Sequence, residues 1–238
     1  MLPEIILEEE EELDYSRLVF AGGFATVAGF LFARLLFPSQ SAILAPVFAA
    51  IPMIYPLMTY YLEREERPDF FQETSVYASL FTGIAAAFFS ISFIIPEAFD
   101  LQLGLVGVSG YATAEASFLS VLLNNMTVFG GILGVSFLLG SAGAFILVWN
   151  ASVLGAFFSH LVRDVSGVQA IVSTASPLAY FPHATLEMTG FIIAGILGTT
   201  ASASVYREHW SMEHWKKLAK LCLVGFSAIL GGAFIETV

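Results

Sequence analysis

The sequence predicts an all-α polytopic membrane protein, a transmembrane helical bundle of about seven spans. Of its 238 residues, 57% are hydrophobic and 12% are charged, and the mean hydropathy is +0.81. A soluble domain is about one quarter charged, so this composition cannot cover a water-exposed surface. Several apolar runs also reach the roughly 20 residues that a helix needs to cross a bilayer. These observations exclude an ordinary soluble domain, a disordered chain and a disulfide scaffold.

The charge distribution excludes nucleic acid as a partner. The expected partner is the lipid bilayer. The net charge is −11, and no segment resembles a basic patch. Five of the acidic residues form one run, Glu8–Glu12, in a segment without the basic n-region of a cleaved signal peptide. We therefore expect residues 1–17 to be an acidic cytoplasmic N-terminus and the first span to stay in the mature chain.

The first spans follow from apolar runs of bilayer length. The second run contains Pro46, Pro52 and Pro56, which predict kinks or a broken helix. A membrane helix tolerates such prolines where neighbouring helices provide hydrogen-bond partners for the freed backbone groups. A tight connection at residues 38–41 precedes it, and a charged loop at residues 63–69 follows it. The three runs are Leu18–Phe37, Ala42–Leu62 and Val76–Ile95.

The remaining spans depend on one long uncharged segment. Phe118–Val162 holds 45 residues without a charge, which is too long for one helix and suits two. Gly140-Ser141 is the expected turn between them. This division gives spans at Phe118–Leu139, Ala142–Val162, His183–Ser202 and Leu218–Val238.

Three connecting segments have a mixed character. Pro96–Ala116 carries acidic residues and no Lys or Arg, and we expect a loop outside the membrane with an interfacial helix. Arg163–Phe181 is a loop whose apolar part, Val168–Thr174, is too short to span and is a candidate to re-enter the bilayer. Val205–Lys217 is polar with Trp210 and Trp215, which is typical of a membrane interface.

The distribution of Lys and Arg favours seven spans with a cytoplasmic N-terminus in a cell membrane. Only Arg163 is then clearly outside, and Arg34 lies near the outer end of the first span. Six spans with a re-entrant hairpin is the alternative, and it moves the cluster at residues 207–220 outside. In the seven-span arrangement, the basic residues inside are Arg17, Arg64, Arg67, Arg207, Lys216, Lys217 and Lys220.

His183 and Glu187 are the first candidates for an intramembrane polar site. They lie four residues apart and therefore share one helix face. Small residues continue that face, so it should pack against another helix. The pair either binds a metal or relays protons, or it pairs with itself and with backbone groups as a structural element. Pro182 should lie in the first helical turn, where the helix dipole favours an acid. The small residues on this face are Gly190, Ala194 and Gly198.

Further polar residues lie on other small-residue strips. Glu236 either extends a strip of Gly225 and Gly232 into the bundle or is solvated at the outer interface. Asn124 shares a strip with Gly131 and Gly134, and it is followed by Asn125.

The amide side chains allow two interpretations. Asn124, Asn125 and Asn150 either cross-link helices by hydrogen bonds or line a polar path with His183 and Glu187. The first interpretation makes them structural, and the second makes them part of a transport route.

Two catalytic or metal-binding motifs are rejected. Ser109 lies in a short G-x-S-G match within the acidic loop, and His209, Glu213 and His214 have the wrong spacing for a zinc motif. We expect no enzyme activity, no cofactor and no metal.

The order of the polar motifs resembles the stage II sporulation protein M family. In that family an asparagine pair opens one span, an N-G pair lies in the next, a P-H-G-x-x-E-type motif begins the following span, and a glutamate lies near the end of the last. Ala151 replaces the glycine after Asn150, and Ala184 with Thr185 departs from the third motif. The matching residues are Asn124-Asn125, Asn150 with Gly155, Pro182-His183, Glu187 and Glu236.

The resemblance implies a domain division and a role. It covers Val76–Val238 as a five-span membrane domain, with residues 18–75 as an added N-terminal hairpin and loop. The namesake is a membrane component of a cell-wall-remodelling complex in spore-forming bacteria and is not thought to be its hydrolase. We therefore expect a non-enzymatic component or scaffold of a membrane complex, with membrane or cell-envelope protein partners. The alternative is a transporter or channel for a small solute or ion that uses the Asn/His/Glu site.

Overall fold

Long helices make up nearly all of the described protein, as the composition predicts. The computed structural model describes residues 14–63, 70–108, 117–164, 177–206 and 211–237, and these contain no β-strand. The long helices hold 21 to 30 residues each. At 1.5 Å per residue, such helices can cross a hydrocarbon core of about 30 Å. They are α2 (Tyr15–Leu36), α3 (Ser41–Glu63), α4 (Phe70–Ile94), α6 (Phe118–Leu139), α7 (Ala144–Asp164), α8 (Pro177–Tyr206) and α9 (Met212–Thr237).

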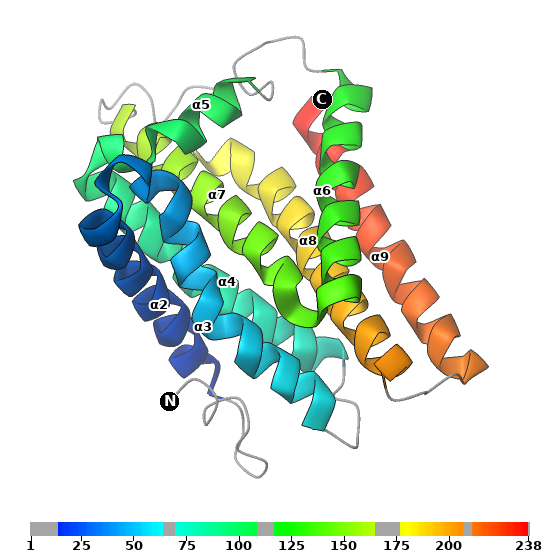
Figure 1. The fold of residues 1–238 in the computed structure, drawn as a ribbon. Coiled ribbons are helices and arrows are strands. Elements are labelled where there is room, and N and C mark those ends of the chain that lie inside the picture. Colours follow the sequence, from blue (N-terminus) through cyan, green and yellow to red (C-terminus); the bar gives the residue numbers. More distant parts are fainter. Residues whose placement is uncertain (1–13, 64–69, 109–116, 165–176, 207–210, 238) are drawn as a thin grey trace.

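Successive long helices run in alternating directions along the bundle (Figure 1). The beginning of α2 and the end of α9 therefore lie at opposite ends. We call the end with Thr237 and the short helix α5 (Asp100–Val108) the upper end, and the end with Tyr15 and Met212 the lower end. Short 3-10 turns connect some of the helices, namely η1 (Pro38–Gln40), η2 (Pro96–Phe99) and η3 (Gly140–Gly143).

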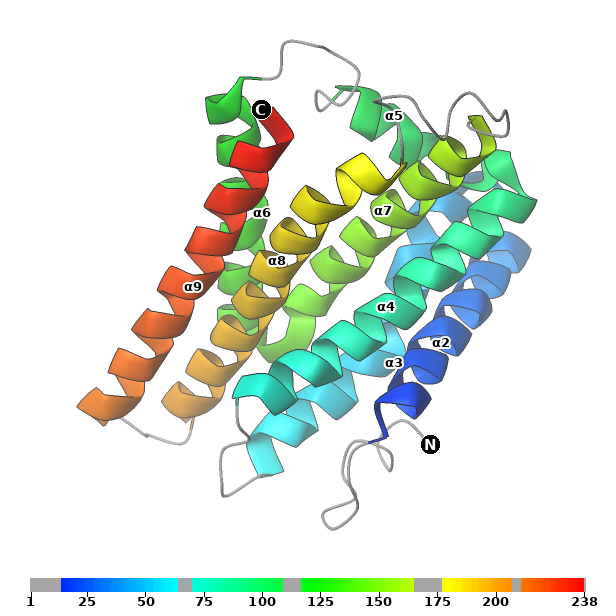
Figure 2. The ribbon, with the colours of Figure 1, turned by 180° about the vertical axis from the view of Figure 1, so that it is seen from behind.

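The long helices pack as two groups that are joined along α8. One group contains α2, α3, α4 and α7, and the other contains α6 and α9 packed on α8. Helix α8 also contacts α3, α4 and α7. Figure 2 shows this division from behind, with α8 between α9 and the remaining group. This position makes α8 the most buried long helix that has the composition of a span.

Helix α2 packs into the bundle through glycines that allow backbone contact. A methyl group on Gly22 would lie 2.5 Å from the main-chain oxygen of Leu80 in α4. A methyl group on Gly29 would lie 2.7 Å from the main-chain nitrogen of Ala49 in α3. Since ordinary contacts begin near 3.4 Å, both positions require the absence of a side chain.

Helix α3 is continuous from Ser41 to Glu63, so of the two outcomes that its prolines predicted, kinks or a break, the break is wrong. Pro46 lacks the N–H that would donate to the carbonyl of Ala42. The side-chain amide of Gln102 on α5 replaces it and donates to that carbonyl at 2.7 Å. Gln102 itself is fully buried. A distant side chain therefore satisfies the acceptor that the proline leaves, and the helix persists.

The expected loop at 96–116 begins as an ordered cover of the upper end. Phe99 of η2 is fully buried, and its ring lies 5.8 Å from Phe30 and 5.3 Å from Phe88 between centroids. Helix α5 follows and packs on α7 and α3, so the helix expected in this segment is present.

The predicted turn between Phe118–Leu139 and Ala142–Val162 is confirmed. Helix α6 ends at Gly140, whose φ of 64° lies in the left-handed region that glycine adopts most readily. The 3-10 turn η3 then reverses the chain into α7. A methyl group on Gly143 would lie 2.7 Å from the oxygen of Ile132, so this turn also folds back tightly on α6.

Helix α8 begins earlier than the sequence pattern indicates. It starts at Pro177 rather than His183, so Pro182 lies inside the helix and Glu187 lies beyond its first turn. The expectation that Glu187 is favoured by the helix dipole is therefore wrong, because that effect fades within the first turn. The first helical position is occupied by Pro177 instead of Pro182. Proline suits this position because the N–H that it lacks would have no partner within the helix.

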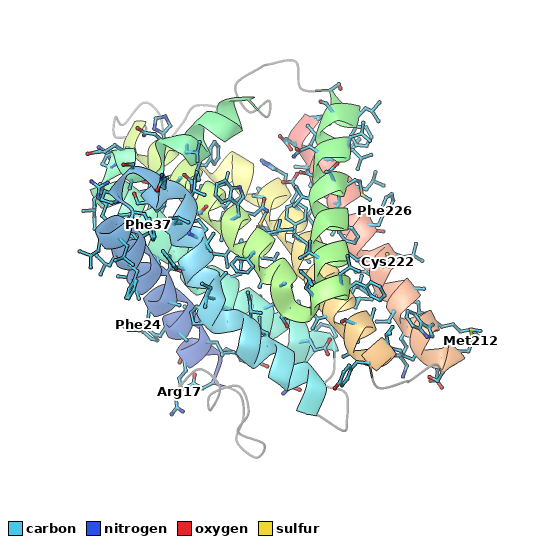
Figure 3. The ribbon with its side chains drawn as sticks, viewed as in Figure 1. Arg17, Phe24, Phe37, Met212, Cys222 and Phe226 are labelled. Carbon is cyan, nitrogen blue, oxygen red and sulfur yellow. The ribbon has the colours of Figure 1, made fainter. Side chains whose placement is uncertain are left out.

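The outer surface of the bundle is strongly apolar. Exposed fractions reach 78% for Phe20, 76% for Phe24 and 75% for Leu138. Figure 3 shows Phe24 and Phe226 on the outside of α2 and α9. Soluble proteins rarely expose contiguous surfaces of this kind, whereas lipid accommodates them. By length and composition, five helical segments among the described residues can cross a membrane, and one of them, Phe118–Arg163, comprises α6 and α7.

Candidate functional site

A cluster of polar side chains forms where α6, α8 and α9 meet toward the upper end. Asn125 comes from α6, Glu187 from α8 and Glu236 from the last turn of α9. Asn125 is 6% exposed and Glu187 is 4% exposed. Buried polar groups of this kind must be hydrogen-bonded, because isolated charges in a bundle interior are costly.

Asn125 and Glu187 form a direct link between α6 and α8. The side-chain nitrogen of Asn125 donates to Glu187 Oε1 at 2.5 Å. The neighbouring Asn124 donates in turn to Asn125 Oδ1 at 3.3 Å. The amide of Asn125 is thus occupied on both its oxygen and its nitrogen, and its orientation is held.

Glu236 brings a second carboxyl group to the cluster. Its side chain hydrogen-bonds with that of Glu187 and is itself half-buried. A hydrogen bond between two carboxyl groups requires a proton on one of them, since ionised carboxylates only accept. Of the two placements expected for Glu236, the structure supports the one inside the bundle, with partial exposure at the upper end.

Glycines on α9 make room for this cluster. A methyl group on Gly232 would lie 2.7 Å from Glu187 Cγ and 3.2 Å from the main-chain oxygen of His183. Lower in the bundle, α8 and α9 are equally close. A methyl group on Gly190 would lie 2.6 Å from Ile229 Cδ1, and a methyl group on Gly225 would lie 2.8 Å from Ile193 Cγ2.

The small-residue faces of α8 and α9 therefore pack as predicted. Ala194 is fully buried on the same helix as Gly190. Absence of side chains at these positions brings the two helices close enough for Glu187 and Glu236 to meet.

His183 is buried on the same face of α8 as Glu187, and the described hydrogen bonds of the glutamate do not include one to it. It is 3% exposed and lies one turn before Glu187 on α8. The hydrogen bonds of the Glu187 carboxyl go to Asn125 and Glu236 instead. The predicted shared face is correct, but the partners of the glutamate come from two other helices.

Asn150 hydrogen-bonds within its own helix. Its side-chain nitrogen donates to the carbonyl of Ile146 at 2.8 Å on α7, and its side chain is half-buried. This contact is local backbone bonding, not the cross-helix bond that its mid-span position suggested. A polar path through Asn150 thus gains no support from this contact.

The expected packing role of Gly131 and Gly134 is wrong. A methyl group on Gly134 would meet nothing within 4 Å, and one on Gly131 would make only ordinary contact with Ile146. The face of α6 toward α8 is formed instead by buried Asn125, Phe129, Ile132 and Ser136. The rotation of α6 about its axis therefore places Gly131 and Gly134 off the contact.

Gly198 is the position where α6 and α8 approach most closely among the predicted glycines. A methyl group there would lie 2.5 Å from both the oxygen of Leu133 and Cβ of Ser136. The same methyl group would lie 3.0 Å from the nitrogen of Phe137. These are mainly backbone atoms, which cannot rotate away.

A second polar link, which the sequence did not reveal, joins α8 and α9 at the lower end. Ser204 Oγ lies 2.7 Å from Nε2 of His214, and both residues are buried. Trp215, expected at the interface, is half-buried against the core. A spacing of ten residues across a chain reversal has no periodic signature, so only packing brings Ser204 and His214 together.

Several sequence predictions fall outside the described residues. They include Ser109, the apolar segment Val168–Thr174, Arg64, Arg67, Arg207, His209 and Trp210. Among the residues that the structure describes, no group of three or more His, Cys, Asp or Glu side chains could hold a metal ion.

The Asn125–Glu187–Glu236 cluster has two chemical capacities. It can tie three helices together through buried hydrogen bonds, and it can hold one proton between its two carboxyl groups. The first capacity stabilises the bundle, and the second allows exchange of a proton or another cation.

Comparison with known proteins identifies the family. The family model described as Stage II sporulation protein M matches residues 18–238. No curated protein and no solved structure matches the chain. The match begins within α2, so it extends beyond Val76–Val238, the part that the motifs covered. Because the match covers nearly the whole chain and contains the cluster, this membrane protein belongs to the stage II sporulation protein M family.

Proposed function

We propose that the chain crosses the membrane seven times, with its N-terminus in the cytoplasm. The alternating directions of the long helices support this arrangement (Figure 1). Arg17 at the start of α2 and the lysines in the first turns of α9 share the lower end, whereas Arg34 and Arg163 lie in the last turns of upward-running helices. Basic residues concentrate on the cytoplasmic side of membrane proteins, and this rule supports a cytoplasmic lower end.

Cysteine labelling in intact cells tests this topology. The background is Cys222→Ser, which removes the one native thiol. A membrane-impermeant maleimide should label Asp100→Cys from outside and Glu213→Cys only after permeabilisation. Labelling of both from the same side would contradict seven crossings, and the reversed pattern would contradict the orientation.

For function, we propose a non-enzymatic component of a membrane complex. The supporting observation is that Glu187 is almost fully buried and its carboxyl is engaged by Asn125 and Glu236. A polar cluster closed on its own hydrogen bonds suits a fixed link between helices. The family match supports the same role, because the namesake belongs to an assembly. Partners are expected in the membrane or the cell envelope.

Purification in mild detergent tests the proposal when it is combined with two substitutions. Co-purifying proteins are identified for the wild-type chain, Glu187→Gln and the control Glu213→Gln, whose glutamate is exposed on α9. Glutamine keeps an acceptor for Asn125 and can donate to Glu236, so all three proteins should retain the same stoichiometric partner. A wild-type chain that purifies without a stoichiometric partner would contradict this proposal.

The second candidate is a transporter or channel for a small solute or ion. It is favoured by the partial exposure of Glu236, which gives the buried Glu187 carboxyl a contact toward the upper surface. Proteoliposomes with an entrapped pH dye test it. Proton movement that Glu187→Gln abolishes and Glu213→Gln leaves intact would support transport, and equal rates in protein-free liposomes would exclude proton transport.

A further inference from the structure

A cavity of about 250 Å³ lies at the upper end, away from the glutamate cluster. It is bounded by the ends of α4 and α7, with η2 and α5 on another side. The residues that line it are Ser92, Pro96, Leu103, Ser159, His160 and Arg163. A volume of this size is close to the lower limit of small-molecule sites and suits a compact polar group.

Arg163 supplies a positive charge that the described protein does not neutralise. Its Nη1 donates to the main-chain oxygen of Phe93 at 3.4 Å, which is a long contact for a hydrogen bond. Among the side chains that the structure describes, no carboxylate forms an ion pair with it. A guanidinium carries five N–H donors in a planar fork that matches the oxygens of a phosphate or carboxylate. Most of these donors are therefore available to an anionic ligand.

Ser159 supplies a second, independent observation. Its side chain is fully buried and is among the residues that line the cavity, and its Oγ has no hydrogen-bond partner among the described residues. A buried hydroxyl left in this state destabilises a protein, and most buried polar atoms in native structures are partnered. A ligand oxygen in the cavity would provide the missing partner.

The surroundings of the cavity match the edge of a bilayer. Phe93, Ile94 and Val162 next to it are 47%, 77% and 40% exposed, which offers an apolar surface beside the charged group. The carboxylates of Glu97 and Asp100 are exposed and are not among the lining residues. The ligand is thus expected to carry its negative charge next to Arg163, with any apolar part along α4 and α7.

We propose that this cavity binds a phosphate group through Arg163 and the Ser159 hydroxyl, with His160 at its rim. Two sources share this chemistry, namely the headgroup of an anionic phospholipid and soluble phosphate. The exposed apolar residues beside the cavity are compatible with the first source, and an open rim at His160 and Arg163 admits the second.

The test measures binding to the full chain purified in a nonionic detergent. Phosphatidylglycerol and inorganic phosphate are titrated separately, and the midpoint of thermal unfolding reports binding. Native mass spectrometry counts retained phospholipid. The variants are Arg163→Gln and Ser159→Ala, and the control is Arg34→Gln, an exposed arginine in the last turn of α2 at the same end.

Arg163→Gln should weaken the apparent affinity about 10- to 100-fold, the usual effect of losing a charge-assisted hydrogen bond. Ser159→Ala should weaken it several-fold while leaving the unliganded midpoint unchanged or higher, because it removes an unpartnered hydroxyl. A purely structural serine would not give this combination. Arg34→Gln should leave binding unchanged.

Each outcome decides the proposal or identifies the source. Binding of phosphatidylglycerol without phosphate assigns a lipid headgroup, and binding of phosphate assigns a soluble ligand. Failure of both probes to bind overturns the proposal. Equal losses for Arg34→Gln and Arg163→Gln also overturn it, because they indicate a general charge effect.

Discussion

Replacing Gly198 by alanine is expected to destabilise the bundle where α6 and α8 are in contact. The new methyl group would lie 2.5 Å from the oxygen of Leu133 and 3.0 Å from the nitrogen of Phe137. Ordinary contact begins near 3.4 Å, so the two helices must separate locally by about 0.9 Å. Helix α6 also carries the Asn125 bond to Glu187, so this separation strains the polar cluster above it.

Gly134→Ala is the matched control for the magnitude. Gly134 also lies on α6, but off the contact with α8, and a methyl group there meets nothing within 4 Å. Both changes gain the same helix propensity, up to about 1 kcal/mol. Their difference therefore reports the steric cost alone. Overpacking costs about 1–3 kcal/mol, so Gly198→Ala should be less stable than Gly134→Ala by that amount.

The free energy of unfolding is measured by titrating the purified protein from mild detergent into denaturing detergent, with helicity followed by circular dichroism. The wild type should lie between the two variants or close to Gly198→Ala. Equal stability of Gly198→Ala and Gly134→Ala would refute the reasoning, since the steric term would then be absent. A crosslink between cysteines on α6 and α8 checks that the helices have separated.

Three further predictions concern polar contacts. Glu187→Leu should cost about 1–3 kcal/mol in the same assay, because it removes the partner of the buried Asn125 and of the half-buried Glu236. Glu187→Gln should stay within about 0.5 kcal/mol of the wild type. Ser204→Ala should cost about 0.6–2 kcal/mol through loss of the bond to His214, and His214→Leu should add little to it in a double variant. Asp14 caps α2, and the hydroxyl of Ser16 holds the pKa of its carboxyl below the usual 3.8. The stabilisation by the Asp14 carboxylate is therefore present above pH 3.8 and is lost as the pH falls through the lower pKa of the folded protein. The difference in melting temperature between Asp14→Ala and wild type should accordingly vanish at the acidic end of a pH series.

The positions of the helices could be predicted because each depends on a local property of the chain. A bilayer requires about 20 apolar residues per crossing, and this length is visible in the sequence. The reversal at Gly140 was likewise predictable, since a glycine in the left-handed region ends a helix. Helix ends were less certain, as the early start of α8 at Pro177 shows. The residues before an apolar span do not reveal whether the helix has already begun.

The partners across helices depended on relative rotation and height, which no local pattern contains. Gly131, Gly134 and Gly198 all belong to small-residue strips, but only Gly198 faces a neighbouring helix at close range. A strip identifies a surface that can be approached, whereas the rotation of each helix decides which surface is approached.

The sequence alone determined that the chain is an all-helical membrane protein and that Asn125, Glu187 and Glu236 are polar residues in apolar segments. Only the tertiary structure decided that these side chains meet, with a distance of 2.5 Å between Asn125 and Glu187. It also decided that Gln102 supplies the donor that Pro46 lacks and that Ser204 reaches His214. Hydrophobic length is a one-dimensional property of the chain, whereas a hydrogen bond between helices requires that two surfaces far apart in sequence be packed together in register.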